Sequence, residues 1–467
     1  MVVKKKSIPI VSKVTCPHCW HQFPPEDSLW ISQHPSLMGQ DPRLAESEYL
    51  RFSPERFDVQ CGAIDPLGYT SNDVACPKCH LAVARPLIEI PPFFLSIIGA
   101  PSSGKSYFLA AMTWRLRQVL PQNFMIGFAD ADAGANSELQ NNENLQFLNM
   151  EQDKPVMILK TQEEADHLYD QVLMGGVAVR YIKPFLFSLR PLPKHPNGDV
   201  RSISRVVCLY DNAGESFLPG ADAATQPVTR HLGLSEALFF LFDPTQDMRF
   251  RRAVSGKTDD FQMREREKRT EREASVRQDT ILASASNMIK SQMGLSQNDL
   301  HEKPLVIIIT KFDTWSSLIG EDRIPDPWEK NPNGGPDGVS IERVQEISDR
   351  VRQVLVEHAS ELVSVAEGFC REVIYLPVSA TGCSPQVDDE TDQPIGIAPK
   401  DINPMWVEVP LLYVLARFTE GVVPQKITRD QANVESTIDD PDEESQISSA
   451  SNRPPYPPEL PELPDIL

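Results

Sequence analysis

A glycine-rich segment that ends in a lysine and a serine has the spacing needed to hold a phosphate. Residues 99 to 106 read GAPSSGKS and match the pattern GxxxxGK[ST]. They follow an apolar run and open a helical stretch, which is the context that this motif requires. Backbone N–H groups can surround a phosphate, Lys105 can bridge two phosphates, and the Ser106 hydroxyl can bind Mg²⁺. We expect nucleotide contacts from Gly99, Ser102, Ser103, Gly104, Lys105, Ser106 and Tyr107.

A second segment combines an aspartate with a glycine after the β-branched run RVVCLY. Residues 211 to 215 read DNAGE. Asp211 can hold Mg²⁺ through a water molecule, and Gly214 can offer its N–H to a terminal phosphate with little steric hindrance. A DxxG pattern is a weak signal alone, but it is strong after a strand and downstream of the glycine-rich loop. We assign a catalytic role to Lys105, Gly214 and Glu215.

Two further segments carry groups that can distinguish guanine from adenine. The tetrapeptide TKFD at 310 to 313 follows the run LVIII, and SAT at 379 to 381 follows VIYLPV. The Asp313 carboxylate can accept hydrogen bonds from guanine N1 and N2, a donor pair that adenine lacks. The Lys311 stem can lie along the base, and the Ala380 N–H can meet guanine O6. The four segments together predict a Mg²⁺-dependent GTP/GDP site, with base contacts from Thr310, Lys311, Asp313, Ser379 and Ala380.

Four of the eight cysteines form two matching CPxC units near the N-terminus. Each two-residue spacer can form a tight knuckle that directs two thiolates at one ion, and four sulfur ligands in a tetrahedron suit Zn²⁺. One CxxC could be a redox pair, but two such units favour a structural zinc site, with no open position for catalysis. We expect the ligands to be Cys16, Cys19, Cys76 and Cys79. The nearby Cys61 is not an expected ligand; the histidines close enough to substitute, otherwise surface residues, are His18, His21 and His80.

Apolar runs alternate with helical stretches between residues 89 and 425, which is typical of a mostly parallel sheet covered by helices on both faces. We therefore predict an α/β P-loop NTPase core. The predicted strands are Phe93–Ile98, Phe185–Leu189, Arg205–Tyr210, Leu238–Phe242, Leu305–Ile309 and Val373–Val378. The predicted helices are Ser106–Leu120, 262–293, Ile341–Glu367 and Pro404–Phe418.

Several connections are too long to be plain loops, and we expect them to be insertions on the core. They span 121–184, 244–262, 314–338 and 383–403. The predicted helix at 262–293 has a charged first half, which is either a solvated helix or an arm that binds an effector. Its second half becomes apolar at Ile281, Leu282, Met288 and Ile289, and we expect this half to pack on the sheet.

Composition and charge limit the classes of partner. The chain has 467 residues and a formal net charge of −21, which argues against a nucleic-acid partner. No apolar run approaches the roughly 20 residues of a membrane span, and the N-terminus lacks the apolar region of a secretory signal. We expect a cytoplasmic protein with no membrane span. The predicted domains are a zinc-binding head at 1–88, a GTPase domain at 89–425 and a disordered acidic, proline-rich tail at 426–467.

The order of the four nucleotide-site motifs resembles that of translation-factor and Ras-type GTPases. More narrowly, the CPxC head, the DxxGE segment and the closing run WVEVPLLYVLARF are similar to the bacterial double-GTPase group, although this chain carries only one complete motif set. The first resemblance implies a GTPase that acts as a molecular switch, with a protein effector and an activating protein as partners. The second implies a role in a bacterial conflict or defence system.

The chain departs from the GTPase pattern at three places, of which the first concerns the bonds that brace the loop and the other two concern hydrolysis. Thr310 replaces the usual asparagine, Glu215 stands where Ras-like proteins carry a water-positioning glutamine, and the switch threonine has no clear position, with Thr161 as one candidate. We therefore expect slow intrinsic turnover, or a GTP-binding scaffold with little or no hydrolysis. An ATPase of the additional-strand class is a second alternative, but Pro244 follows Asp243 where such an enzyme needs a glutamate.

Overall fold

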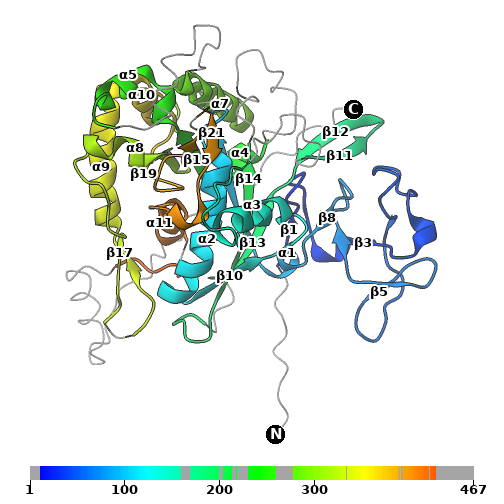
Figure 1. The fold of residues 1–467 in the computed structure, drawn as a ribbon. Coiled ribbons are helices and arrows are strands. Elements are labelled where there is room, and N and C mark those ends of the chain that lie inside the picture. The colour runs from blue at the N-terminus through cyan, green and yellow to red at the C-terminus, as the bar shows by residue number, and fades with distance from the viewer. Residues whose placement is uncertain are drawn as a thin grey trace, which may run out of the picture.

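The core of the molecule is a seven-stranded sheet built from the apolar runs of the sequence (Figure 1). The computed structural model describes residues 11–158, 169–198, 203–212, 217, 230–258, 277–332, 334–388, 390, 393–419 and 421–426. The strands lie in the order β10 (Ile126–Asp130), β13 (Phe185–Pro191), β14 (Arg205–Asp211), β9 (Pro92–Gly99), β15 (Ala237–Phe242), β16 (Leu305–Ile309) and β19 (Val373–Pro377). Neighbours from β14 to β19 pair in parallel, whereas β13 is antiparallel to both β14 and β10. The predicted mixed α/β class with a mostly parallel sheet is confirmed.

Strand β9 lies where the winding of the sheet reverses. From β9 the chain first builds β10, β13 and β14 on one side, and it then crosses to β15, β16 and β19 on the other. In open α/β sheets, ligands bind outside the carboxyl ends of the strands at such a reversal. The end of β9 at Gly99 is therefore a topologically favoured place for a ligand.

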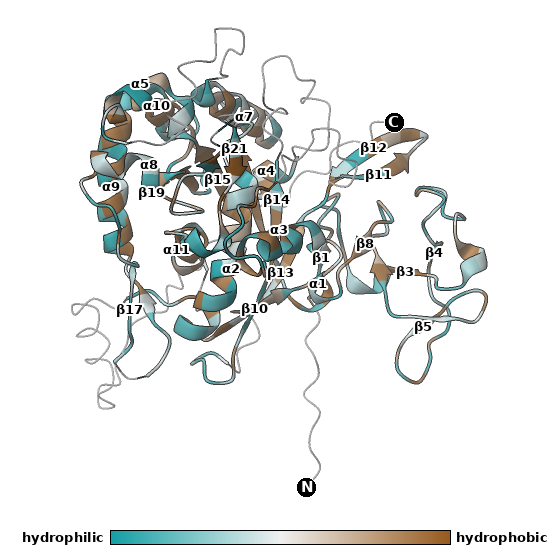
Figure 2. Cartoon of the chain, in the orientation of Figure 1, coloured by the Kyte–Doolittle hydropathy of each residue, from teal (hydrophilic) through white to brown (hydrophobic). Residues whose placement is uncertain are grey.

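The central strands are almost entirely apolar because both faces of the sheet are covered. Every residue of β15 and β16 is buried, and β9 is buried from Phe93 to Gly99. Figure 2 shows this band of hydrophobic residues in the centre and hydrophilic residues on the outer helices. None of the described helices has the length and apolar character that crossing a membrane requires.

Helices of different lengths connect and cover the strands. Helix α2 contacts both α3 and β10, α9 contacts β19, and α7 contacts β9, α4 and α10. The bounds are α2 (Lys105–Asn123), α3 (Ser137–Phe147), α4 (Arg230–Leu234), α5 (Met248–Val254), α7 (Gln278–Met293), α8 (Phe312–Trp315), α9 (Ile341–His358), α10 (Ser360–Phe369) and α11 (Val409–Phe418).

Two predicted helices differ from the structure in their bounds. The helix predicted at Ile341–Glu367 is two helices, because the backbone of Ala359 leaves the helical region at φ −148° and ψ 47°. The closing helix begins at Val409 rather than Pro404, after Trp406 adopts a positive φ of 57°. The apolar half of the predicted helix at 262–293 is α7, and its charged half, up to residue 276, lies outside the described residues.

The predicted insertion at 121–184 contains elements that the sequence did not reveal. These are β10, α3 and a hairpin of β11 (Tyr169–Met174) and β12 (Val177–Ile182). Two small ladders lie in the later insertions, β17 (Trp328–Glu329) with β18 (Gly338–Val339) and β20 (Gln386–Val387) with β21 (Pro394–Gly396).

The N-terminal head is built from short strands. Its ladders are β1 (Val14–Thr15) with β2 (Gln22–Phe23), β5 (Ala63–Ile64) with β6 (Thr70–Ser71), and a four-stranded sheet of β4 (Arg51–Phe52), β3 (Leu29–Ile31), β7 (Val74–Ala75) and β8 (Ala82–Val83). Helix α1 (Pro86–Glu89) leads from the head to β9. Part of the head packs against β14 and the β11–β12 hairpin, and these residues share one buried cluster.

Candidate functional site

The glycine-rich loop joins the end of β9 to the start of α2. Gly104 has a φ of 89° and Ser102 a φ of 59°, so the loop turns sharply before Lys105 opens the helix. The Lys105 ammonium group donates to the carbonyls of Gly99 (3.1 Å) and Ala100 (3.3 Å). The Lys105 ammonium group therefore lies across the loop, and the N-terminus of α2 follows directly. Both features favour an anionic ligand.

Close packing explains the small residue at the start of this loop. A Cβ on Gly99 would lie 3.0 Å from Ser103 Oγ and 3.1 Å from the Leu241 carbonyl oxygen. Ser103 itself is fully buried, and its hydroxyl has no hydrogen-bond partner among the described residues. Farther along α2, the Tyr107 hydroxyl accepts a hydrogen bond from the Ile158 N–H (2.9 Å), and burial raises the pKa of Tyr107. Tyr107 therefore stays protonated and anchors the inserted segment to α2.

Asp211 is the last residue of β14, next to the strand that carries the glycine-rich loop. In the parallel ladder Asp211 is opposite Ile97, two residues before Gly99. The following Asn212 donates from both its backbone N–H (3.2 Å) and its amide Nδ2 (2.9 Å) to the Ile97 carbonyl. These bonds fasten the end of β14 to β9. The predicted Gly214, Glu215 and Thr161 lie outside the described residues.

The segment TKFD forms the turn from β16 into α8 and is braced against the glycine-rich loop. Lys311 has a φ of 55°, and the Thr310 hydroxyl lies 3.4 Å from the Ser103 carbonyl and 3.2 Å from that of Phe242. The Trp315 indole N–H donates to the Thr310 carbonyl (3.0 Å). The Thr310 hydroxyl thus braces this turn against the glycine-rich loop.

The two segments expected to read a base meet through their side chains. The Ser379 hydroxyl donates to the Asp313 carboxylate, and the same hydroxyl accepts the Gly382 N–H at 2.8 Å. The Asp313 carboxylate is thus fixed next to the Ser379–Thr381 turn. Ala380, predicted to contact the base through its N–H, is partly buried against the core in this turn.

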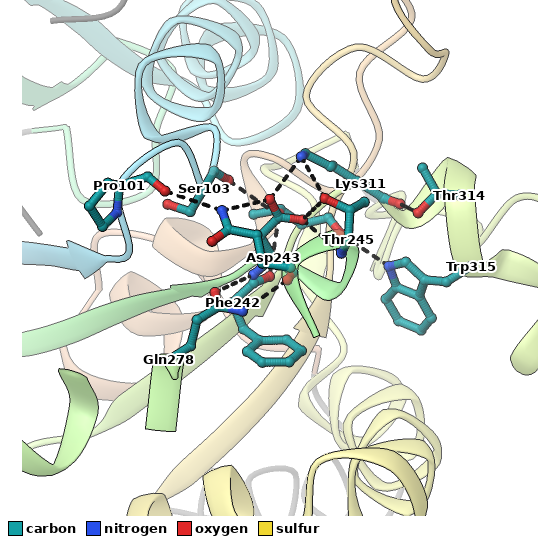
Figure 3. Close-up of polar contacts among 11 residues, drawn as sticks. Pro101, Ser103, Phe242, Asp243, Thr245, Gln278, Lys311, Thr314 and Trp315 are labelled. Carbon is teal, nitrogen blue, oxygen red and sulfur yellow. Dashed lines mark hydrogen bonds and ion pairs between the residues drawn. The ribbon is translucent and has the colours of Figure 1, made fainter. Parts of the chain in front are cut away.

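Asp243 is a buried centre of polar contacts that the sequence did not identify. It follows β15, and its Oδ2 lies 2.8 Å from Lys311 Nζ and 3.0 Å from Gln246 Nε2 (Figure 3). Gln246 also donates to the Pro101 carbonyl in the glycine-rich loop at 3.1 Å. The Gln278 side chain bonds both backbone groups of Asp243, at 2.8 and 2.9 Å. The Lys311 ammonium group is anchored on Asp243 and on Thr245 Oγ1 (3.1 Å), and the contact of its stem with a base stays a prediction.

The four predicted cysteine ligands converge in the head. Their Sγ atoms all lie within 4.8 Å of one another, with 3.7 Å between Cys16 and Cys79 and 3.6 Å between Cys19 and Cys76. A tetrahedron with Zn–S bonds of about 2.3 Å has sulfur–sulfur edges of about 3.8 Å, so the four buried thiols fit one Zn²⁺ ion. A predicted four-cysteine cluster is confirmed; the identity of its metal is not.

The two CPxC units have the same local geometry. In each, the residue after the second cysteine has a positive φ, 55° for Trp20 and 64° for His80, and its N–H bonds the carbonyl of the first cysteine. In each, an N–H also points to the first cysteine's sulfur at 3.4 Å, from His18 and from Lys78. These bonds stabilise thiolate charge, as metal ligands require.

The remaining candidate ligands have other partners. Cys61 is exposed and lies outside the cluster, as expected. His80 Nδ1 lies 2.9 Å from Asp41 Oδ2, and His18 Nε2 lies 3.2 Å from the Ala82 carbonyl. These side chains support the knuckles from outside.

Comparison with known proteins leaves the family of the chain open. No protein-family model matches the chain, and no curated protein sequence matches it. Among solved structures it is weakly similar to the S. cerevisiae Ski7 GTPase-like domain bound to GDP and inorganic phosphate, with 13% identity, a TM-score of 0.25, and coverage of 69% of this chain and 49% of that one. For the same domain bound to GTP the identity is 12%, the TM-score 0.22, and the coverage 72% and 52%. The chain thus spans about half the length of the structures that it matches.

Proposed function

We propose that this chain binds GTP and GDP with Mg²⁺ and acts as a nucleotide-controlled switch with slow intrinsic hydrolysis. The observation that carries the proposal is that described residues of all four motifs lie at the carboxyl ends of parallel strands of one sheet. The glycine-rich loop follows β9, Asp211 ends β14, Asp313 follows β16 and Ser379 follows β19. This edge lies at the reversal of winding, where α/β sheets bind ligands.

Each motif supplies one kind of contact in the proposed site. The loop from Gly99 to Ser106 would hold the phosphates, and Lys105 would exchange its carbonyl contacts for phosphate oxygens. Ser106 and Asp211 would ligate Mg²⁺. The Asp313 carboxylate, held by Ser379, would accept the guanine N1 and N2 protons.

Base selection follows from the fixed carboxylate. An ionised aspartate offers only acceptors, which match two neighbouring donors on guanine and mismatch the single N6 amino group and N1 acceptor of adenine. The ion pair of Lys311 with Asp243 supports this role, because it fixes the backbone of the turn that presents Asp313.

The finer parts of the proposal concern turnover, metal and organisation. A carboxylate at Glu215 would be repelled by the terminal phosphate, so we expect slow hydrolysis unless an activating protein supplies an arginine, an effect of roughly 10³ to 10⁵ in rate. Zinc in the four-cysteine centre would be structural. The division into a head at 1–88, a GTPase domain at 89–425 and a tail at 426–467 belongs to the same proposal, as do a protein effector and a cytoplasmic defence role.

The direct test is binding of a fluorescent GTP analogue, with competition by GTP, GDP and ATP. We expect GTP and GDP to compete and ATP not to. Lys105→Ala should abolish binding, because the triphosphate loses the main positive charge of the loop, whereas Lys400→Ala, at an exposed ion pair, should bind normally. Preference for ATP, or normal binding by folded Lys105→Ala protein, would refute the proposal.

A single-turnover hydrolysis assay separates the switch from its alternative. If GTP binds but is not cleaved even over hours, the chain is a GTP-binding scaffold. Rapid cleavage by the purified chain alone would contradict the role that we give to Glu215.

A further inference from the structure

The first cysteine knuckle contacts the strand that ends in Asp211. The Trp20 indole N–H donates to the Tyr210 hydroxyl at 3.2 Å, and that hydroxyl in turn donates to the Pro17 carbonyl at the tip of the knuckle. Tyr210 is fully buried, and burial raises its pKa well above the ordinary value, so the hydroxyl remains a donor. Tyr210, the residue before the candidate Mg²⁺ ligand Asp211, is therefore held by two hydrogen bonds of its hydroxyl to the knuckle.

His231 provides a second route from the knuckle to the same place. Its ring stacks on Trp20, with centroids 5.6 Å apart and planes 28° apart, and lies 4.6 Å from the ring of Tyr210. His231 Nε2 lies 2.7 Å from Asn212 Oδ1. Because the Asn212 amide nitrogen donates to the Ile97 carbonyl, its oxygen must accept, and His231 Nε2 is the donor. A buried chain of contacts thus runs from Trp20 through His231 and Asn212 to β9, two residues before Gly99.

The opposite side of the knuckle contacts the inserted β11–β12 hairpin. Tyr181 packs edge-on against Trp20 at 6.3 Å, and His18 Nδ1 lies 3.5 Å from Asp170 Oδ2. This hairpin precedes β13, in the connection between the glycine-rich loop's helix and the strand that ends in Asp211. The knuckle therefore contacts both β14 and the β11–β12 hairpin.

We propose that the four-cysteine metal centre and the nucleotide site are thermodynamically coupled, with His231 as the positioning residue between them. The metal holds Trp20 in place, Trp20 and His231 hold Tyr210 and Asn212, and these place Asp211 for Mg²⁺–nucleotide. Loss of the metal frees the knuckle and with it the end of β14. This inference rests on the proposed nucleotide function, and it adds that metal occupancy controls nucleotide affinity.

Coupling between two sites must be reciprocal, which gives two independent measurements on the full chain. The first is the affinity for a fluorescent, non-hydrolysable GTP analogue with Mg²⁺, before and after zinc removal by a chelator, with folding checked by circular dichroism. We expect zinc removal to weaken binding by about fivefold or more, the lower end of typical allosteric coupling. The second is the affinity for zinc, measured by competition with a chromophoric chelator, which saturating analogue should raise by the same factor.

A matched pair of variants isolates the route. His231→Phe keeps a ring that can stack on Trp20 but removes the donor to Asn212, so it should retain zinc and bind nucleotide while the coupling falls to what the Trp20–Tyr210 contact carries. His301→Phe replaces another buried, ring-stacked histidine, which packs on Phe369 away from the knuckle. This control should keep the full coupling.

The outcomes separate this inference from the proposed function. No binding of the analogue by zinc-loaded protein would refute the nucleotide function, and this inference with it. Binding that is equal with and without zinc, in folded protein, would overturn the coupling alone. If the zinc-free protein unfolds, a zinc affinity that is unchanged by the analogue would overturn it, as would full coupling in His231→Phe.

Discussion

Lys311 Nζ lies 2.8 Å from Asp243 Oδ2, and this ion pair joins the ends of β15 and β16 beneath the glycine-rich loop. Asp243 is fully buried and the Lys311 side chain is 19% exposed, so the pair is partly shielded from water. Gln246 extends the contact to the Pro101 carbonyl. The loop expected to bind phosphates and the turn expected to read the base therefore share one buried carboxylate.

Replacing this carboxylate should destabilise the protein. Asp243→Asn removes the charged acceptor of Lys311, and hydrogen bonds to charged groups contribute about 1.5 to 3 kcal/mol. We expect the free energy of unfolding in urea to fall by about this amount. The exposed ion pair of Arg249 with Glu361 is the control, because Glu361→Gln should cost about 1 kcal/mol or less. Equal losses in the two variants would show that the Asp243 pair is no more than a surface contact.

Asp313→Asn should change the preferred base. The amide would direct a donor at one of guanine's two donors, a mismatch that costs about 1 to 3 kcal/mol, so GTP affinity should fall by about tenfold. Xanthine carries a carbonyl where guanine carries its amino group, and xanthosine triphosphate should bind the variant better than the parent. Competition titrations measure both. Asp322→Asn, in the exposed segment after α8, should change neither affinity.

Metal content tests the four-cysteine centre directly. We expect one zinc per chain by elemental analysis, and its loss in Cys16→Ser, because an open three-thiolate set binds the ion less tightly than the closed set. Cys61→Ser should keep its zinc, since Cys61 lies outside the cluster. Protein purified without chelator that contains no metal would refute the assignment.

A buried histidine makes stability depend on pH. Burial, and secondarily the nearby Lys303 charge, lower the pKa of His301 to about 4, against 6.5 for an unfolded histidine. Between these values the unfolded chain binds a proton that the folded chain does not, so stability is full above pH 6.5 and falls as the pH drops toward 4. The loss from this residue is up to about 3 kcal/mol. In His301→Phe the free energy of unfolding in urea should depend less on pH between 6.5 and 4. An unchanged pH dependence would contradict the assignment.

The sheet could be predicted closely from the sequence, for a physical reason. Parallel strands covered on both faces are continuous apolar runs, and the run LVIII at 305–309 coincides with β16. Strand β10 escaped prediction because IGFAD is only partly buried and is not a continuous apolar run. The break at Ala359 escaped because apolar residues recur at helical spacing on both sides of it, and periodicity alone does not mark such a break.

The candidate site was predictable where a motif identifies a residue by its spacing, and unpredictable where the contact is tertiary. The placement of Asp313 next to Ser379 follows from two strand ends that share one edge of the sheet. No spacing rule connects Asp243 with Lys311, or Trp20 with His231, because each pair is distant in the chain. The one available signal in the sequence was that Asp243 directly follows a wholly apolar strand. A carboxylate buried there needs a partner that compensates its charge.

The packing of the head on β14 also constrains how the chain can fold during synthesis. The hydrogen bond from Trp20 to Tyr210 spans 190 residues. At a synthesis rate of roughly 5 to 20 residues per second, the first knuckle leaves the ribosome roughly 10 to 40 s before the strand on which it rests. During that interval Trp20, Val14 and Phe23 lack the apolar surface that later buries them. Until β14 has been made, this apolar surface of the nascent head is therefore open to association with other chains.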